Sequence, residues 1–329
     1  MNYFEGVEKG KYIISTAQRG AKANKNFLNN LMLLKEKEGI EQISLFVTQG
    51  THKNRLDEEF LDESLSNEEN FYLINGDNPL KRMSVKSAPN INEKCRLYYT
   101  QVLPQNVNPF FGYASKTSSL YSYIINGTKA RFEVLPHKQG SPRFIMSTGS
   151  ITSPKYREHF AIGQKAKEQH QFGAAIIEVI NNKKFIPYQI VANNEGNFTH
   201  KNIKYKNGKE IPENAAAMVL GDPHLAVIDK EAFEETMSQI KKCKPGEIHM
   251  GDLFDGLSIN HHDKKNHLRR LDLFEKGKLD FRKEIEDVYI FLKKLSKKFP
   301  DTKFFLTYDN HSQNIIKYII EDKRHLSDI

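Results

Sequence analysis

The sequence predicts an α/β protein in which a β-rich α+β domain precedes a carboxy-terminal β-α-β layer. Beyond residue 215, short apolar runs alternate with helical patterns, which is typical of a mostly parallel sheet. Residues 96–147 instead carry several β-prone runs that prolines separate. The polar stretch 193–214 lies between the two regions, as a boundary or with a hairpin inside it. We therefore expect an α+β domain of unknown role over residues 1–210 and a second domain over residues 215–329.

The amino-terminal domain is expected to open with a strand, a helix and a strand. The helix is indicated over residues 26–37, where Phe27, Leu31 and Leu34 recur at helical spacing. The pair Asn181-Asn182 predicts a turn between the last two strands of the domain. The expected strands are residues 11–15, 42–48, 71–74, 96–102, 120–125, 130–134, 143–147, 174–180 and 184–191, and a further helix is expected over residues 156–171.

The carboxy-terminal region repeats one pattern three times, in which a short apolar run leads into a loop with Asp, His or Asn. Helices over residues 230–243 and 281–299 separate the three runs, and Pro300 ends the second helix. Parallel strands joined in this way have right-handed crossovers. Ligands of such sheets bind beyond the carboxyl ends of the strands. The three polar loops are therefore expected to converge at one edge of the sheet.

The polar residues of these loops suit a two-metal phosphoesterase site. Such a site needs carboxylates, imidazoles and one carboxylate that bridges two ions about 3.5–4 Å apart, which polarise the phosphate and generate hydroxide at neutral pH. Asp222 and His224 offer a carboxylate and an imidazole from one loop, and Asp252 follows the next run. We expect Asp252 to bridge the ions and Asn310 to give a neutral oxygen. His311 is then the candidate general acid.

Structural roles compete with this interpretation. Asp222 and Asp252 also suit turns at strand ends or helix caps. His224 gains weight as a ligand only from its neighbour Asp222, and His311 is equally suited to a structural role. Asp255 is expected to hydrogen-bond a metal ligand from behind, or to cap the next turn, rather than to bind an ion.

The motifs Asp222-Pro223-His224, Gly251-Asp252-Leu253-Phe254-Asp255 and Asn310-His311, in this order, resemble the signature of the calcineurin-like metallophosphoesterases. The resemblance covers about the last third of the chain and implies a metallophosphoesterase-type domain there. Asp309 and Ser312 depart from the glycine and the acidic residue that flank Asn-His in that family. The chain also ends at Ile329, before the family's last two histidine motifs. We therefore expect a truncated domain that binds one ion weakly, with a longer chain or a partner supplying the remaining ligands.

A basic stretch follows the second motif. It contains His261, His262, Arg269 and Arg270. Adjacent histidines do not easily face one ion, so we interpret the stretch as a loop that contacts substrate phosphate, with a solvated loop as the alternative. Contacts of this kind position a nucleic acid strand without reading its sequence.

Two regions of the sequence are similar to the sequences of the first-step DNA-transfer proteins of T-five-like phages. The first region comprises residues 146–156 and then 170–174, and the second runs from Gly251 through His262. The polar run Ser147-Thr148-Gly149-Ser150 in the first region also has a simple packing interpretation. The resemblance implies a manganese-dependent DNase that acts early in infection. The alternatives are a non-catalytic DNA-binding or assembly protein with a degenerate site, and a small-molecule phosphatase.

Composition agrees with a nucleic acid partner. The 329 residues carry a net charge of +8 and a pI of about 9.1, which favours polyanions. No apolar run is long enough to span a membrane, and the amino terminus lacks the pattern of a signal peptide. Cys95 and Cys243 match no zinc or redox spacing and are expected to be reduced. We expect a protein of the cytoplasm, or of the host cytoplasm if a phage encodes it, with a homo-oligomer as an open possibility.

Overall fold

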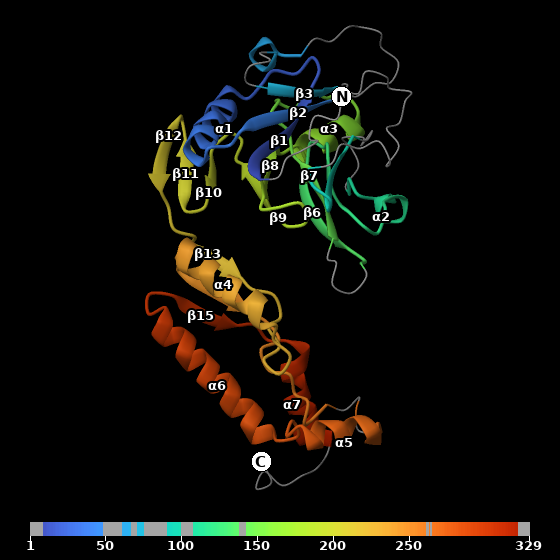
Figure 1. The fold of residues 1–329 in the computed structure, drawn as a ribbon, viewed down its shortest axis with the longest axis vertical. Coiled ribbons are helices and arrows are strands. Elements are labelled where there is room, and N and C mark those ends of the chain that lie inside the picture. The colour runs from blue at the N-terminus through green and yellow to red at the C-terminus, as the bar shows by residue number, and fades with distance from the viewer. Residues whose placement is uncertain are drawn as a thin grey trace. The chain divides into compact units, whose positions relative to one another are not determined.

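The computed structural model describes residues 9–48, 61–66, 71–75, 91–99, 108–137, 143–260, 263 and 265–321. The chain divides into two compact units, Met1–Pro212 and Glu213–Ile329 (Figure 1). Both units mix helices with sheets, as the sequence predicts at the level of fold class. Cys95 and Cys243 are both free thiols.

The first unit is built on a five-stranded sheet with the order β3-β2-β1-β8-β9. The first three strands in this unit are parallel, and β8 and β9 continue the sheet in antiparallel pairing. The chain opens β-α-β, and β8 pairs with β9 around the predicted turn, so both predictions are confirmed. The strands are β1 (Gly10–Gln18), β2 (Gln42–Thr48), β3 (Phe71–Asn75), β8 (Phe172–Val179) and β9 (Phe185–Ala192).

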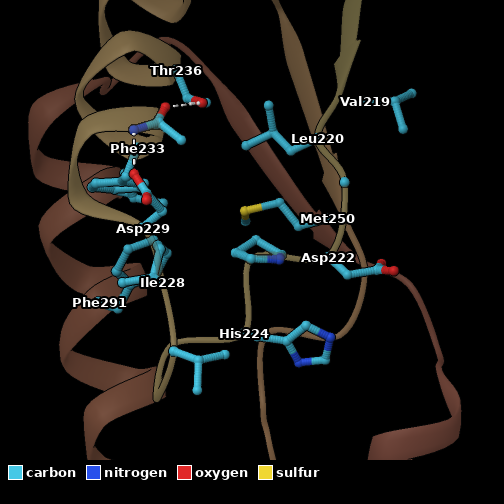
Figure 2. A pocket seen from close by; sticks show the side chains of 15 residues that line it. Val219, Leu220, Asp222, His224, Ile228, Asp229, Phe233, Thr236, Met250 and Phe291 are labelled. Carbon is cyan, nitrogen blue, oxygen red and sulfur yellow. Dashed lines mark hydrogen bonds between the residues drawn. The ribbon is translucent and has the colours of Figure 1, made fainter. Parts of the chain in front are cut away.

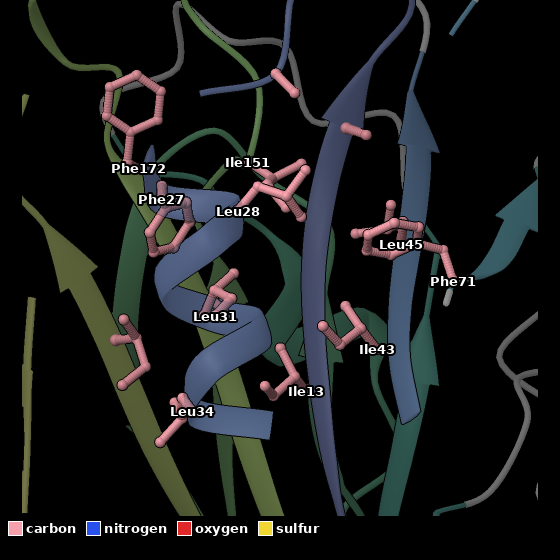
Figure 3. Close-up of a cluster of buried hydrophobic side chains, with 14 of the residues drawn as sticks. Ile13, Phe27, Leu28, Leu31, Leu34, Ile43, Leu45, Phe71, Ile151 and Phe172 are labelled. Carbon is pink, nitrogen blue, oxygen red and sulfur yellow. The ribbon is translucent and has the colours of Figure 1, made fainter. Parts of the chain in front are cut away.

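One face of this sheet is covered by helix α1 (Lys25–Glu38). The Asn24 side chain accepts a hydrogen bond from the Phe27 amide and caps the helix, which ends at Gly39 in the left-handed conformation. Figure 3 shows Leu31 and Leu34 of α1 beside Ile13 of β1, and all three are fully buried. The predicted helical spacing therefore marks the face that forms the core.

The other face of the five-stranded sheet packs on a second sheet. Tyr12 and Ile14, which alternate with Ile13 along β1, share a buried cluster with Leu97 and Ile124 of the second sheet. The order of that sheet is β4-β5-β7-β6, with only β6 antiparallel. Its strands are β4 (Cys95–Tyr98), β5 (Ser122–Ile125), β6 (Ala130–Leu135) and β7 (Arg143–Thr148), and the short helix α2 (Tyr113–Lys116) precedes β5.

The predicted helix over residues 156–171 is too long, because α3 spans only Ala161–Glu168. An ideal Cβ on Gly163 would collide with the backbone of Arg157, so the chain before the helix folds tightly back over this glycine. The Tyr156 hydroxyl lies 2.7 Å from Nδ1 of His170, beyond the other end of the helix. These tertiary contacts hold the flanking residues out of the helix. The predicted strand over residues 96–102 is also shorter, and its last residues lie outside the described part of the chain.

The polar stretch 193–214 is mostly folded. It forms an antiparallel sheet of β10 (Phe198–His200), β11 (Ile203–Lys206) and β12 (Lys209–Pro212) within the first unit. Gly208 and the left-handed Asn207 form the turn between the last two strands. The alternative of a hairpin inside the stretch is thus the better one, and the boundary between the units falls after Pro212.

The second unit contains a parallel sheet with the order β13-β14-β15. These strands are β13 (Ala217–Val219), β14 (Glu247–Met250) and β15 (Lys303–Leu306), and they are joined through α4 (Lys230–Cys243) and α6 (Phe281–Lys298). Ile240 of α4 and Leu295 of α6 pack with Ile248 and Met250 of β14. The predicted strand-helix alternation with a parallel sheet is therefore confirmed.

Two further helices of the second unit carry polar residues that the sequence predicts as site residues. They are α5 (His267–Glu275) and α7 (Asn310–Glu321). Asn310 and His311 lie in the first turn of α7 rather than in a loop, because only three residues separate the end of β15 from the start of α7. Among the described residues, no helix combines the length and the apolar character that a membrane crossing requires.

Candidate metal centre

Three segments of the second unit meet where the parallel strands end. The loop after β13 brings Asp222 and His224, the loop after β14 brings Asp252 and Asp255, and α7 brings His311. The His224 amide donates to the Asp252 carbonyl over 3.0 Å, which ties the first two loops together. The Thr307 amide donates to the Met250 carbonyl over 2.9 Å and holds the third segment beside the second.

The backbone is strained at two of the site residues. His224 has φ 47° and Asp252 has φ 28°, values that residues with a Cβ rarely adopt. Such conformations cost about 1–3 kcal/mol each and persist where the surrounding structure imposes them, often at functional sites. The two strained residues belong to the candidate metal centre, which supports a function for this edge of the sheet.

His224, Asp252 and His311 together could hold a metal ion. One ligand atom from each side chain lies within 4.8 Å of those of the other two. The two imidazole rings are tilted against each other, with their centroids 4.9 Å apart. A donor set of two imidazoles and one carboxylate suits several divalent first-row metals, and the geometry does not select one of them.

Asp255 orients both histidines from behind. Its backbone carbonyl accepts a hydrogen bond from Nδ1 of His311 over 2.7 Å, and its Oδ1 lies 3.3 Å from Nδ1 of His224. The Asp255 side chain is buried, and its Oδ2 accepts the Ala226 amide over 2.7 Å. The hydrogen bond to Nδ1 of His311 leaves Nε2 of that ring for an ion, and the Asp255 carboxylate lies close enough to Nδ1 of His224 to favour the same arrangement there.

The Asp252 carboxyl is poorly satisfied by the protein. Its Oδ1 is buried and has no hydrogen-bond partner. Burial raises the pKa of Asp252, and so do the neighbouring Asp309 charge and a hydrogen bond with that carboxyl. Because buried polar atoms are nearly always paired, an orphaned carboxylate oxygen between two histidines fits a cation. The residues present therefore suit a metal ion.

The neighbouring Asp309 is a site residue that sequence reasoning passed over as a departure from a motif. Burial alone would raise the pKa of Asp309, but hydrogen bonds from Ser312 and Asp252 outweigh it, so that the pKa is lowered. Its Oδ1 accepts the Ser312 amide over 2.7 Å and caps the start of α7. The sequence signal for this cap is an aspartate three residues before a serine at the start of a helix.

The other predicted ligands lie beside this group. Asp222 is exposed and is not one of the three grouped residues, although its charge acts on Asp252. Its Oδ1 would lie 2.8 Å from a Cβ built on Gly251, so the Asp222 carboxylate lies close against the start of the second loop. Asn310 is exposed at the first position of α7.

Glu284 of α6 holds the loop that carries Asp255, and sequence reasoning did not identify it. Its carboxylate accepts the Leu257 amide over 2.8 Å and the Ser258 amide over 3.2 Å, besides the Ser258 hydroxyl. Burial raises the pKa of Glu284, with a smaller contribution from the Asp255 charge. A glutamate within the first turn of a long amphipathic helix carries no sequence signal for this task.

The structure describes two of the four residues that the sequence predicts as phosphate contacts. His261 and His262 lie outside the described residues. Arg269 and Arg270 lie in the first turns of α5, and Nε of Arg269 is 2.9 Å from the Asp263 carboxylate. One of the two arginine charges is therefore already paired.

A cavity of about 560 Å³ lies between α4, α6 and the strand ends, with Asp222 and His224 among its lining residues. Figure 2 shows Phe233, Ile228 and Phe291 on one side of it and Leu220 and Met250 on the other. The Phe233 and Phe291 rings are 5.4 Å apart. A mostly apolar cavity thus adjoins the polar candidate metal centre.

Comparison with known proteins gives one informative relationship. The chain is 24% identical to Protein A1 of Escherichia phage T5 over 239 residues, which are 69% of this chain and 42% of that protein. The chain thus spans less than half the length of this relative. No family model and no solved structure matches the chain. The relationship to a phage protein is distant.

Proposed function

We propose that this chain is a metal-dependent phosphodiesterase that cleaves DNA, with residues 215–329 as its metallophosphoesterase-like domain. The observation that carries the proposal is the group of His224, Asp252 and His311, in which Oδ1 of Asp252 is buried and has no hydrogen-bond partner. The motif resemblance described above and the distant relationship to Protein A1 of Escherichia phage T5 support it. The net charge of +8 favours a polyanionic substrate.

Each residue has a proposed task. His224, Asp252 and His311 would hold a divalent ion, which we propose to be manganese, and Asp222 and Asn310 would offer oxygens to a second ion. Ions at these positions would polarise the phosphate and make water a better nucleophile. Asp255 fixes the tautomer and direction of both imidazoles through its contacts to their Nδ1 atoms.

The placement of His311 changes the role that the motif suggested for it. Its Nδ1 donates to the Asp255 carbonyl, so only Nε2 can act on an ion or a leaving group. One nitrogen cannot bind a metal ion and deliver a proton at the same time. Because this hydrogen bond leaves Nε2 as the available nitrogen and His311 is one of the three grouped residues, we propose His311 as a ligand rather than the general acid.

The test is calorimetry with manganese combined with plasmid nicking by the full chain. We expect weak manganese binding and slow nicking, and both should disappear on chelation. Manganese binding without nicking, together with DNA binding, would favour the non-catalytic DNA-binding alternative. Hydrolysis of nitrophenyl phosphate without nicking would favour a small-molecule phosphatase. Absence of manganese binding would contradict the proposal as a whole.

A further inference from the structure

The cavity beside the candidate metal centre changes from polar to apolar along its length. Asp222 and His224 line it at the end of β13, where the metal group lies. The remaining wall is mainly aliphatic and aromatic, from Leu220, Met250, Phe233 and Phe291. With a cation bound at the metal group, a ligand that fits both parts has an anionic group and an apolar group joined by a short link.

The size and shape of the apolar part restrict that group further. A volume of about 560 Å³ lies within the range of roughly 300–1,000 Å³ usual for small-molecule sites. The tilted rings of Phe233 and Phe291 offer aromatic surface to a flat group. Asp229 and Thr236 add two polar groups to the lining, and each already makes a hydrogen bond within α4. The lining thus suits a flat heteroaromatic group with few polar contacts.

We propose that this cavity binds a nucleobase of the substrate while the linked phosphate lies at His224 and Asp222. The inference rests on the proposed function and specifies its substrate as a nucleotide unit whose base is unpaired. A base stacked in a duplex cannot enter a pocket without leaving the stack, which costs a few kcal/mol. Single strands and frayed ends are therefore the preferred substrates.

Val227 offers a way to fill the cavity without disturbing the core. It lines the cavity, yet its side chain is 67% exposed, so replacement by a larger residue does not overpack the interior. Val227→Trp places an indole where the base would lie. Ile320→Trp is the matched control, because Ile320 is 69% exposed, belongs to α7 and does not line the cavity.

The first experiment measures binding in the presence of a chelator, so that it does not depend on metal or on catalysis. Ligand-observed NMR of the full chain compares deoxyadenosine 5′-monophosphate with deoxyribose 5-phosphate. We expect the nucleotide to bind at least about tenfold more tightly, and Val227→Trp, but not Ile320→Trp, to remove the difference. Equal affinity of the two ligands for the unaltered chain, or a preference that survives Val227→Trp, would overturn the inference.

The second experiment separates this inference from the proposed function. With manganese, we expect single-stranded oligonucleotides to be cleaved at least about tenfold faster than duplexes, and Val227→Trp to lower that rate without changing manganese affinity. Cleavage that Val227→Trp leaves unchanged would contradict the base pocket while the phosphodiesterase proposal stands. Nucleotide-selective binding in a chain that neither binds manganese nor cleaves DNA would leave the pocket supported and the phosphodiesterase rejected.

Discussion

Nδ1 of His311, at the start of α7, donates a hydrogen bond of 2.7 Å to the backbone carbonyl of Asp255. The same aspartate contacts Nδ1 of His224 through its side chain. One residue thus contacts two imidazoles from different segments, and both histidines are grouped with Asp252.

Asp252→Asn should weaken manganese binding by more than about 100-fold and reduce nicking to background. The substitution removes the negative charge at the centre of the group while it preserves the size of the side chain. The expected loss exceeds the roughly 10- to 100-fold effect of removing a residue that only orients a ligand. Calorimetry and nicking are measured together. Asp272→Asn is the control, since Asp272 is exposed on α5 and pairs with Lys276, which directly follows that helix. Nicking that survives Asp252→Asn would contradict the mechanism.

Asp255→Asn should lower manganese affinity by about 10- to 100-fold and leave the fold intact. The carbonyl that accepts from His311 is unchanged, so the loss comes from the side-chain contact to His224. Calorimetry gives the affinity, and far-ultraviolet circular dichroism checks the fold. An unchanged manganese affinity would show that Asp255 serves the loop alone.

His311→Gln decides between the ligand and the general-acid roles. A ligand role predicts a loss of manganese affinity of at least about tenfold. A general-acid role predicts unchanged affinity, slower cleavage and loss of the alkaline limb of the pH–rate profile. We expect the loss of affinity. His249→Gln is the matched control, because His249 lies on β14 and stacks on Phe305 outside the metal group.

Arg269 and Arg270 should differ in their contribution to DNA binding. Each phosphate contact contributes about 0.9 to the slope of log affinity against log salt concentration. Because Arg269 already pairs with Asp263, Arg270→Ala should reduce the slope by up to about 0.9 and Arg269→Ala by less. Filter binding over a range of salt concentrations measures both slopes. Equal slopes in the two variants and the unaltered chain would exclude α5 from the DNA contact.

His170 should make the first unit less stable in acid. Burial lowers the pKa of His170 to about 4 from its ordinary value of 6.5. The unfolded chain therefore takes up a proton below pH 6.5 while the folded chain resists it, so stability that is complete above pH 6.5 falls until about pH 4. The difference corresponds to roughly 3 kcal/mol. Urea unfolding should show a flatter pH dependence in His170→Gln, and no such change in His159→Gln, whose side chain is exposed.

Much of the architecture could be predicted because it depends on local periodicity. The helical spacing of Leu31 and Leu34 and the apolar run around Ile248 mark buried faces whatever surrounds them. The start of α3 could not be predicted, because Gly163 accommodates a backbone that folds back over it. The sheet of β10 to β12 was obscured by polar side chains in a stretch whose turn residues suggested a boundary.

The candidate site could be predicted only in part from the sequence, because much of it depends on contacts between separate segments rather than on a local pattern. Residues that directly follow apolar runs, such as His224 and Asp252, could be selected by position. Their strained backbone conformations and the contact between Asp309 and Asp252 depend on how three separate segments meet. Glu284 reaches the site from a helix far along the chain, so no local pattern indicates it.

His224, Asp252 and His311 follow three different strands of one small parallel sheet, and this connectivity has a thermodynamic consequence. An ion held by all three would act as a cross-link that closes two long stretches of chain, so the unfolded state would lose loop entropy much as it does with a disulfide. Ligand binding to the folded state alone adds RT ln(1 + [L]/Kd) to stability. Bound manganese would then stabilise the second unit against unfolding, and chelation would destabilise this unit before it affected the first.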